Sequence, residues 1–125
     1  MPRIEVVFFQ DDDGTVPLLE WFDSLPQKAQ DKCRVRIERL QEMGHQLRRP
    51  EADFLRDGIY ELRAKHLGVN YRILYFFHGK QVVVLAQGFS KQHAKVPEKE
   101  IKVAIERRKK FQSASRRYRY KETGL

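Results

Sequence analysis

Hydrophobic and polar residues follow two different rhythms along this chain, and the rhythms separate its elements. Apolar and polar positions alternate, as in half-buried strands, in residues 3–10, 59–65, 71–78 and 81–89. Apolar positions recur at helical spacing in residues 17–25, 27–43 and 97–112. The order β-α-α-β-β-β-α predicts an α+β fold: a small, mainly antiparallel sheet with two N-terminal helices packed on it and a C-terminal helix.

Short turns join the three later strands, which are therefore expected to run antiparallel to one another. In the first of these strands, Glu61, Arg63 and Lys65 share one face and the apolar residues between them share the other. Residues 82–85 (VVVL) are apolar throughout, which indicates a central strand buried on both faces. Residues 45–56 show neither rhythm and are predicted to form a linker.

A length of 125 residues suits one compact domain. We assign residues 1–112 to this domain and residues 113–125 to a basic, flexible tail. The single cysteine, Cys33, lies on the apolar stripe of the second helix, which predicts a buried thiol and excludes a disulfide framework within the chain. No stretch approaches the ~20 apolar residues of a membrane span. These features favour a cytoplasmic protein with no membrane partner.

Lysine and arginine number 25 and aspartate and glutamate 17, which gives a formal net charge of +8. Such an excess favours a polyanionic partner, although a merely soluble basic domain has the same composition. The one dense acidic run, residues 11–13, is followed by no ligand set with metal-site spacing and is interpreted as a solvated turn. We therefore expect no metal and no cofactor.

Two arginines lie on either side of a short turn in the stretch YELRAKHLGVNYRILYFF. If residues near the turn pair, Arg63 and Arg72 approach each other across the hairpin, and two guanidinium groups at close range need an anion between them. Glu61 can be that anion, in an ion pair that steadies a sheet edge. A bound phosphate can also be that anion, held by the planar guanidinium fork. The sequence leaves both interpretations open.

A basic segment, GFSKQHAKVP, follows the last strand and supplies three candidate side chains, Lys91, His93 and Lys95. In an antiparallel sheet this segment lies near the start of the preceding strand, and therefore near Arg72, with Lys65 and His66 close by. A cationic cluster with an imidazole can support RNA cleavage. In that reaction the ribose 2′-oxygen loses its proton, the phosphorane charge is stabilised and the 5′-oxygen is protonated. This chemistry requires no metal.

Four stretches in the same order carry a resemblance to a known family: LRDGIYELRAK, YRILYFF, VVVLAQGFSKQ and HAKVPEKEIKVAIERRKKF. They resemble the RelE superfamily of toxins and look closest to its HigB-like, phage-derived branch. The likeness covers residues 1–111 in element order and is motif-specific over residues 55–111. It implies a RelE-like fold and a ribosome-dependent mRNA endoribonuclease, the toxin of a type II toxin–antitoxin pair. The partner it implies is a helix-turn-helix antitoxin.

The resemblance also implies roles for particular residues. Arg72 corresponds to a stabiliser of the phosphate and transition state, and Arg63 to a phosphate or structural contact. Lys91 and Lys95 correspond to the basic residues that follow the strand in the family. Glutamine follows Lys91 where the family often has a second lysine, and His93 stands where many members have threonine. The general base is therefore left open.

Cations outside this cluster are candidates for further RNA contacts. Lys65, His66 and Lys95 are candidate RNA-binding residues beside the two arginines. Lys32, Arg36 and Arg39 of the second helix are candidates for rRNA contact through phosphates, and can equally form a solvated helix face. Two other functions fit the same residues: a non-catalytic basic module that binds RNA or an acidic partner, and a DNA-binding co-repressor active only with its antitoxin.

Overall fold

The computed structural model describes residues 3–91 and 95–121. These residues form a mixed α+β fold with a six-stranded sheet and three α-helices. In chain order the elements are β1 (Glu5–Phe9), α1 (Pro17–Asp23), α2 (Gln27–Met43), the 3₁₀ helix η1 (Gly44–Gln46), β2 (Ala52–Arg56), β3 (Ile59–His66), β4 (Val69–His78), β5 (Val82–Lys91), α3 (Glu98–Ser113) and β6 (Arg119–Tyr120). Within the described ranges, every helix is too short or too polar to cross a membrane.

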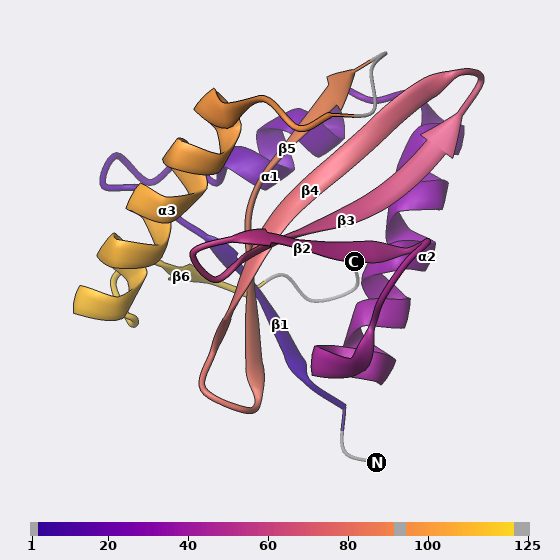
Figure 1. Cartoon of the computed structure of the whole chain (residues 1–125). Coiled ribbons are helices and arrows are strands. Elements are labelled where there is room, and N and C mark those ends of the chain that lie inside the picture. The colour runs from indigo at the N-terminus through magenta and orange to yellow at the C-terminus, as the bar shows by residue number, and fades with distance from the viewer. Residues whose placement is uncertain (1–2, 92–94, 122–125) are drawn as a thin grey trace.

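The strands lie in the order β2-β3-β4-β5-β1-β6, with α3 and α2 on opposite sides of the sheet in Figure 1. β3, β4 and β5 pair antiparallel to their neighbours along the chain, as predicted. β1 pairs parallel to β5, which places β5 between β4 and β1. Val83, Val84 and Leu85 of β5 are fully buried, and this confirms the prediction of a central strand.

One face of the sheet is covered by α1 and α2. Leu62 and Ile73 of the sheet pack in one apolar core with Cys33 and Leu40 of α2, because the apolar positions of strand and helix meet there. Cys33 is 1% exposed, which confirms its predicted burial, and this burial raises the pKa of its thiol to about 11. The thiol is therefore part of the core.

The indole of Trp21 on α1 packs directly over Gly88 of β5. A Cβ at Gly88 would lie 2.2 Å from the indole Cε3, so any side chain there would push α1 away from the sheet. The same indole lies 6.3 Å, centroid to centroid, from the ring of Tyr71. Since Tyr71 precedes Arg72 in β4, α1 braces the strand that carries this arginine.

The opposite face is covered by α3 along only part of its length. Phe111 of α3 packs edge to face on Phe76 of β4 with ring centroids 5.8 Å apart, and Leu74 lies in the same apolar core. The next residue on this face toward the β3–β4 turn is Arg72, because side chains alternate along the strand. The apolar surface therefore gives way to charged residues at this point.

The prediction of a linker over residues 45–56 is wrong, because residues 52–56 form β2 at the edge of the sheet. β2 pairs antiparallel with β3, and its alternation is weak because Ala52 alone among its residues is buried. The turn at Asp57 and Gly58, with φ angles of 51° and 79°, returns the chain directly onto β3. Pairing of the backbone, and not a hydrophobic pattern, makes this segment a strand.

Much of the tail predicted over residues 113–125 is structured as far as the described part extends. Ser113 ends α3, and β6 pairs with β1. The Tyr118 ring stacks on Phe9 at 5.6 Å, and its hydroxyl donates a 2.8 Å hydrogen bond to Asp12. Asp12 also pairs with Lys110 and Arg117. The acidic run thus anchors α3 and the segment after it, which no local spacing in the sequence reveals.

Candidate functional site

The turn between β3 and β4 sets which residues face each other in this hairpin. Leu67 and Gly68 form the turn with φ angles of 49° and 78°, the left-handed conformation of a two-residue hairpin loop. The resulting register places Arg63 directly opposite Arg72. Strand alternation puts Glu61 on the same face as both arginines. The predicted approach of the two arginines is confirmed.

Arg72 is buried in an ion pair with Glu61. It is 2% exposed, and its Nε lies 2.8 Å from Glu61 Oε1. Burial lowers the pKa of Arg72 and raises the pKa of Glu61, in each case against the attraction between the two charges. Glu61 is therefore the anion beside Arg72 in this structure. The pair lies inside the sheet rather than at its edge, because β2 covers β3 at this point.

Lys91, at the end of β5, adds a second buried cation. The strand register places it opposite Asn70, and therefore next to Arg72 on the same face. Its Nζ is buried and has no hydrogen-bond partner among the described residues. Desolvation, followed by the positive charge of Arg72, lowers the pKa of the Lys91 amine. The predicted meeting of Arg72 with the basic segment GFSKQHAKVP is confirmed at Lys91, which the structure places at the end of β5 itself.

The guanidinium of Arg63 completes the group. It is half-buried, and it forms no ion pair or hydrogen bond with any residue that the structure describes. The neighbouring carboxylate of Asp53 is held by Arg49, at 2.7 Å from its Nη2. We call Arg63, Arg72 and Lys91 the cation cluster. In the described part of the chain, Glu61 is its one ion-paired carboxylate.

Other predicted site residues lie apart from the cation cluster. Lys65 shares its face but is exposed near the hairpin turn, and Lys95 is also exposed. His66 follows Lys65, so strand alternation places it on the α1 and α2 face, away from Arg72. Alternation extended by one residue would have shown this from the sequence. His93 lies outside the described residues. No histidine of the described chain therefore joins the cluster.

The two arginines of α2 that were predicted to contact rRNA are engaged by a carboxylate that the sequence did not single out. Glu51 accepts hydrogen bonds from Arg39 Nε at 2.9 Å and from Arg36 Nη1 at 3.2 Å. Arg36 also donates its Nε to the backbone carbonyl of Arg63 at 2.9 Å. Lys32 is exposed and has no such partner in the described part of the chain. Arg36 and Arg39 therefore join α2 to β3, while Lys32 remains open to a ligand.

A buried glutamine on β5 connects the face of the cluster to α3. Gln87 is 5% exposed and donates through Nε2 to the carbonyl of Glu100 at 2.9 Å. Its Oε1 accepts a 3.1 Å hydrogen bond from Arg107 Nη1. A single glutamine in a predicted strand does not indicate, from the sequence alone, that it will form these hydrogen bonds to α3. The network fixes the start of α3 beside the cluster.

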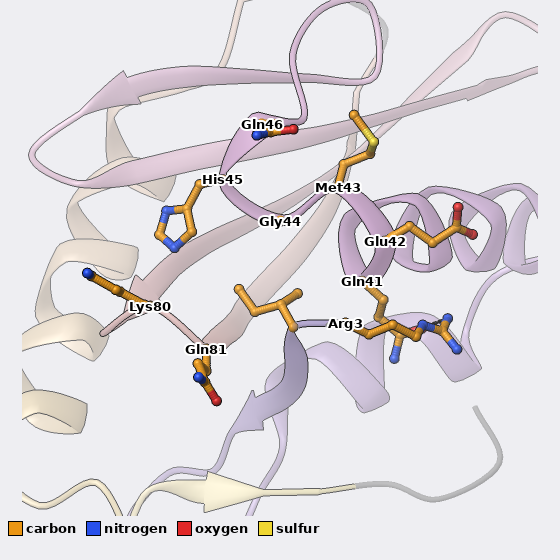
Figure 2. Close-up of a pocket in the computed structure, with 10 residues that line it drawn as sticks. Arg3, Gln41, Glu42, Met43, Gly44, His45, Gln46, Lys80 and Gln81 are labelled. Carbon is orange, nitrogen blue, oxygen red and sulfur yellow. Dashed lines mark hydrogen bonds between the residues drawn. The ribbon is translucent and has the colours of Figure 1, made fainter. Parts of the chain in front are cut away.

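A separate hollow of about 320 Å³ lies between η1, the segment that leads into β1 and the β4–β5 turn. Figure 2 shows His45 and Lys80 on one side of this hollow and Arg3 on the other. It contains none of the predicted site residues. In the described residues, no three histidine, cysteine, aspartate or glutamate side chains are placed to hold a metal ion, here or elsewhere.

Fold and site together define a small basic α+β protein that carries a buried, cation-rich group on one face of its sheet. The family model of phage derived protein Gp49-like (DUF891) matches residues 20–109, which is well over half of the chain and includes the whole cation cluster. The chain belongs to this Gp49-like family, part of the RelE/Gp49 group of toxin-like proteins. No curated protein matches the chain. A toxin-like family implies, in general, an antitoxin as partner.

Proposed function

We propose that this chain is the toxin of a toxin–antitoxin pair and that it cleaves mRNA on the ribosome at the cation cluster. The observation that carries the proposal is the charge imbalance of the cluster. Three cations surround one carboxylate, and the Lys91 Nζ is buried without a partner in the described chain. A buried, unpaired charge is costly, and such groups gather at functional sites. A phosphodiester would supply the missing anion.

The proposed reaction is a transesterification that needs no metal. The ribose 2′-hydroxyl loses its proton and its oxygen bonds to phosphorus. The bond from phosphorus to the 5′-oxygen then breaks as that oxygen is protonated, which leaves a 2′,3′-cyclic phosphate and a 5′-hydroxyl. Arg63 is free to bind the phosphate through its guanidinium fork. Arg72 Nε remains on Glu61 and Nη1 donates a long 3.4 Å hydrogen bond to the Tyr71 carbonyl, so Nη2 is the terminal nitrogen proposed to meet the developing charge.

Two groups in the site are suited to proton transfer. The pKa of Lys91 is lowered and that of Glu61 is raised, so both lie nearer to neutrality than in water. We propose that they share this work, with His93 and Lys95 as further contributors from the segment after β5. Lys32, Lys65 and His66, which lie outside the cation cluster, are proposed to contact rRNA phosphates when no antitoxin is bound, and such contacts weaken strongly as salt rises.

Expression in a bacterial host tests the proposal. The wild-type chain is expected to arrest growth, and primer extension is expected to show cuts inside translated codons. Arg72→Lys keeps a charge at the site but loses the guanidinium fork and should relieve the arrest. The matched control is Arg34→Lys, a partly exposed arginine of α2 that pairs with Asp31, and this variant should stay toxic. Arrest without RNA cuts, or equal toxicity of Arg72→Lys, would contradict the proposal.

The second candidate is a non-catalytic module that binds RNA or an acidic protein on the same face. Two observations favour it: Arg72 is already paired with Glu61, and the described chain places no histidine in the cluster. This candidate predicts RNA binding that Lys91→Met weakens, without cleavage at any enzyme concentration. Incubation of the purified chain with translating ribosomes, followed by sequencing of RNA 5′ ends, separates the two functions.

A further inference from the structure

The C-terminal half of β3, after Leu62, has no neighbouring strand among the described residues on the β2 side and is an open edge of the sheet. β2 pairs with β3 only as far as the pair of Ala52 with Leu62. Beyond it, the Arg63 N–H donates to the carbonyl of Glu51 at 2.8 Å, and the Arg63 carbonyl accepts from Arg36. The backbone groups of Lys65 point the same way as those of Arg63, because the pattern repeats every second residue. No group in the described chain bonds to them.

A hollow lies beside this open edge. It has a volume of about 320 Å³ and lies between α2 and β3, lined by Lys32, Val35, Arg36, Ala64 and Lys65; we call it the edge hollow. Val35 is 53% exposed, unusual for a large apolar side chain in this structure. Figure 1 shows α2 alongside β3 where β3 rises beyond β2. The edge hollow therefore combines apolar surface from Val35 and Ala64, the backbone groups of Lys65 that are unpaired in the described chain, and the side-chain charges of Lys32 and Lys65.

We propose that the edge hollow docks an extended, acidic segment of a partner protein. Such a segment would pair with the Lys65 backbone as an added strand, place an apolar side chain on Val35 and direct carboxylates to Lys32 and Lys65. Arg36 is occupied by Glu51 and the Arg63 carbonyl, so it shapes the hollow without offering its charge. The identity of the partner rests on the proposed function: it is the neutralising antitoxin.

Charge selects this occupant over a second copy of the chain. The chain has a net charge of +8, so two copies repel each other. Its own dense acidic run is also occupied, since Asp11 and Asp12 pair with Lys110 and Asp13 accepts hydrogen bonds from Thr15. A nucleic-acid backbone would use the cations but would gain little from Val35 or from the unpaired edge.

Nuclear magnetic resonance of the full-length chain tests the proposal with a defined probe. The probe is a capped eight-residue peptide of alternating glutamate and valine. We expect saturable shifts centred on the Lys65 amide and the Val35 methyl groups. A peptide with glutamine in place of glutamate should bind at least tenfold more weakly at low salt, since the attraction to Lys32 and Lys65 is lost.

Two substitutions make the test specific. Val35→Glu should weaken binding of the acidic peptide at least tenfold, because it replaces the apolar contact with a like charge. Phe54→Glu is the matched control, since Phe54 is also 53% exposed and lies away from the hollow, on β2. Its affinity should be unchanged. Glutamate is a better helix former than valine, so α2 should tolerate the change at Val35.

Three results would overturn the proposal: no saturable shift, shifts confined to the Arg72 face, or equal weakening by both variants. An eight-nucleotide RNA that shifts the Lys65 and Val35 signals where the peptide does not would also overturn it, and would assign the hollow to RNA. Growth arrest by Val35→Glu reports separately on the proposed function. A variant that still arrests growth but no longer binds peptide keeps the two conclusions apart.

Discussion

Two glutamates near β3 hold arginines in opposite ways. Glu51, whose side chain is 18% exposed, pairs with Arg36 and Arg39, which remain partly in water at 34% and 40% exposure. The side chain of Glu61 is 8% exposed and pairs with the side chain of Arg72, which is 3% exposed. The main cause of the lowered pKa of Glu51 is its hydrogen bond from Arg39. The main cause of the raised pKa of Glu61 is its burial. The same chemical pair therefore has opposite electrostatic consequences.

The difference shows that the Glu51 ion pairs stabilise the fold, whereas the burial of charge around Glu61 costs free energy. Water reaches the Glu51 group, so attraction outweighs desolvation and the pair joins α2 to β3. Around Glu61 desolvation outweighs attraction, and the neighbouring cation Lys91 has no partner in the described chain. The Glu51 group therefore has a structural role. The Glu61 group has the properties of an anion-binding site.

The largest expected effect comes from removing the buried carboxylate. Glu61→Ala leaves Arg72 and Lys91 buried without an anion, and we expect the free energy of unfolding to fall by about 3–5 kcal/mol. Urea unfolding at neutral pH measures the loss, and added inorganic phosphate should restore part of it. Glu106→Ala, which removes an exposed carboxylate on α3, should change little. A loss at Glu61 as small as at Glu106 would contradict the comparison.

Removal of the unpartnered cation should act in the other direction. Lys91→Met keeps the apolar stem and eliminates the buried ammonium, so the free energy of unfolding should rise by about 1 kcal/mol. Binding of phosphate or RNA should fall in the same variant. Thermal unfolding with and without phosphate measures both effects. Lys80→Met, at an exposed turn, is the control, and a destabilised Lys91→Met would show that the amine is satisfied in the native protein.

The two glutamates should also give opposite dependence on pH. The lowered pKa of Glu51 means that its contribution is present above its unfolded pKa and is lost as pH falls through its folded pKa. The raised pKa of Glu61 means that the native chain binds the extra proton, so stability falls as pH rises through its folded pKa.

Matched substitutions measure these slopes. As pH falls from about 7 to about 3, the stability of wild type relative to Glu61→Gln should increase above the unfolded pKa of glutamate, and its stability relative to Glu51→Gln should decline below that pKa. Denaturant unfolding of the three proteins across this range is sufficient. Slopes of the same sign would remove the distinction between the two pairs.

The smallest expected effect on stability is at Arg63. Its guanidinium has no partner in the described chain, so Arg63→Met should change the free energy of unfolding by less than about 0.5 kcal/mol. Affinity for inorganic phosphate should fall by about tenfold, since a charged contact to the anion is lost. Calorimetry with phosphate and urea unfolding together distinguish this ligand contact from a structural one. A large loss of stability would assign Arg63 to the fold.

Much of this architecture could be predicted where each segment carries its own pattern. The spacing of α2, the antiparallel hairpins and the burial of Cys33 follow from local periodicity, and the tight turn brings Arg63 opposite Arg72. β2 could not be predicted because its side chains alternate only weakly, although it pairs with β3 across a two-residue turn. β6 could not be predicted because it becomes a strand by pairing with the distant β1. The binding of Asp12 to Tyr118 and of Glu51 to Arg39 has the same cause. Contacts between distant segments leave no trace in local spacing.

The sequence by itself determined the basic character of the chain, its main helices and hairpins, and the face on which Glu61, Arg63 and Arg72 lie. Only the tertiary structure decided that Arg72 is buried on Glu61, that Lys91 lies beside it without a partner and that His66 is on the other face. The physical reason is desolvation. The sequence determines which side chains are charged, but the free energy of each charged side chain depends on how much water the fold leaves around it.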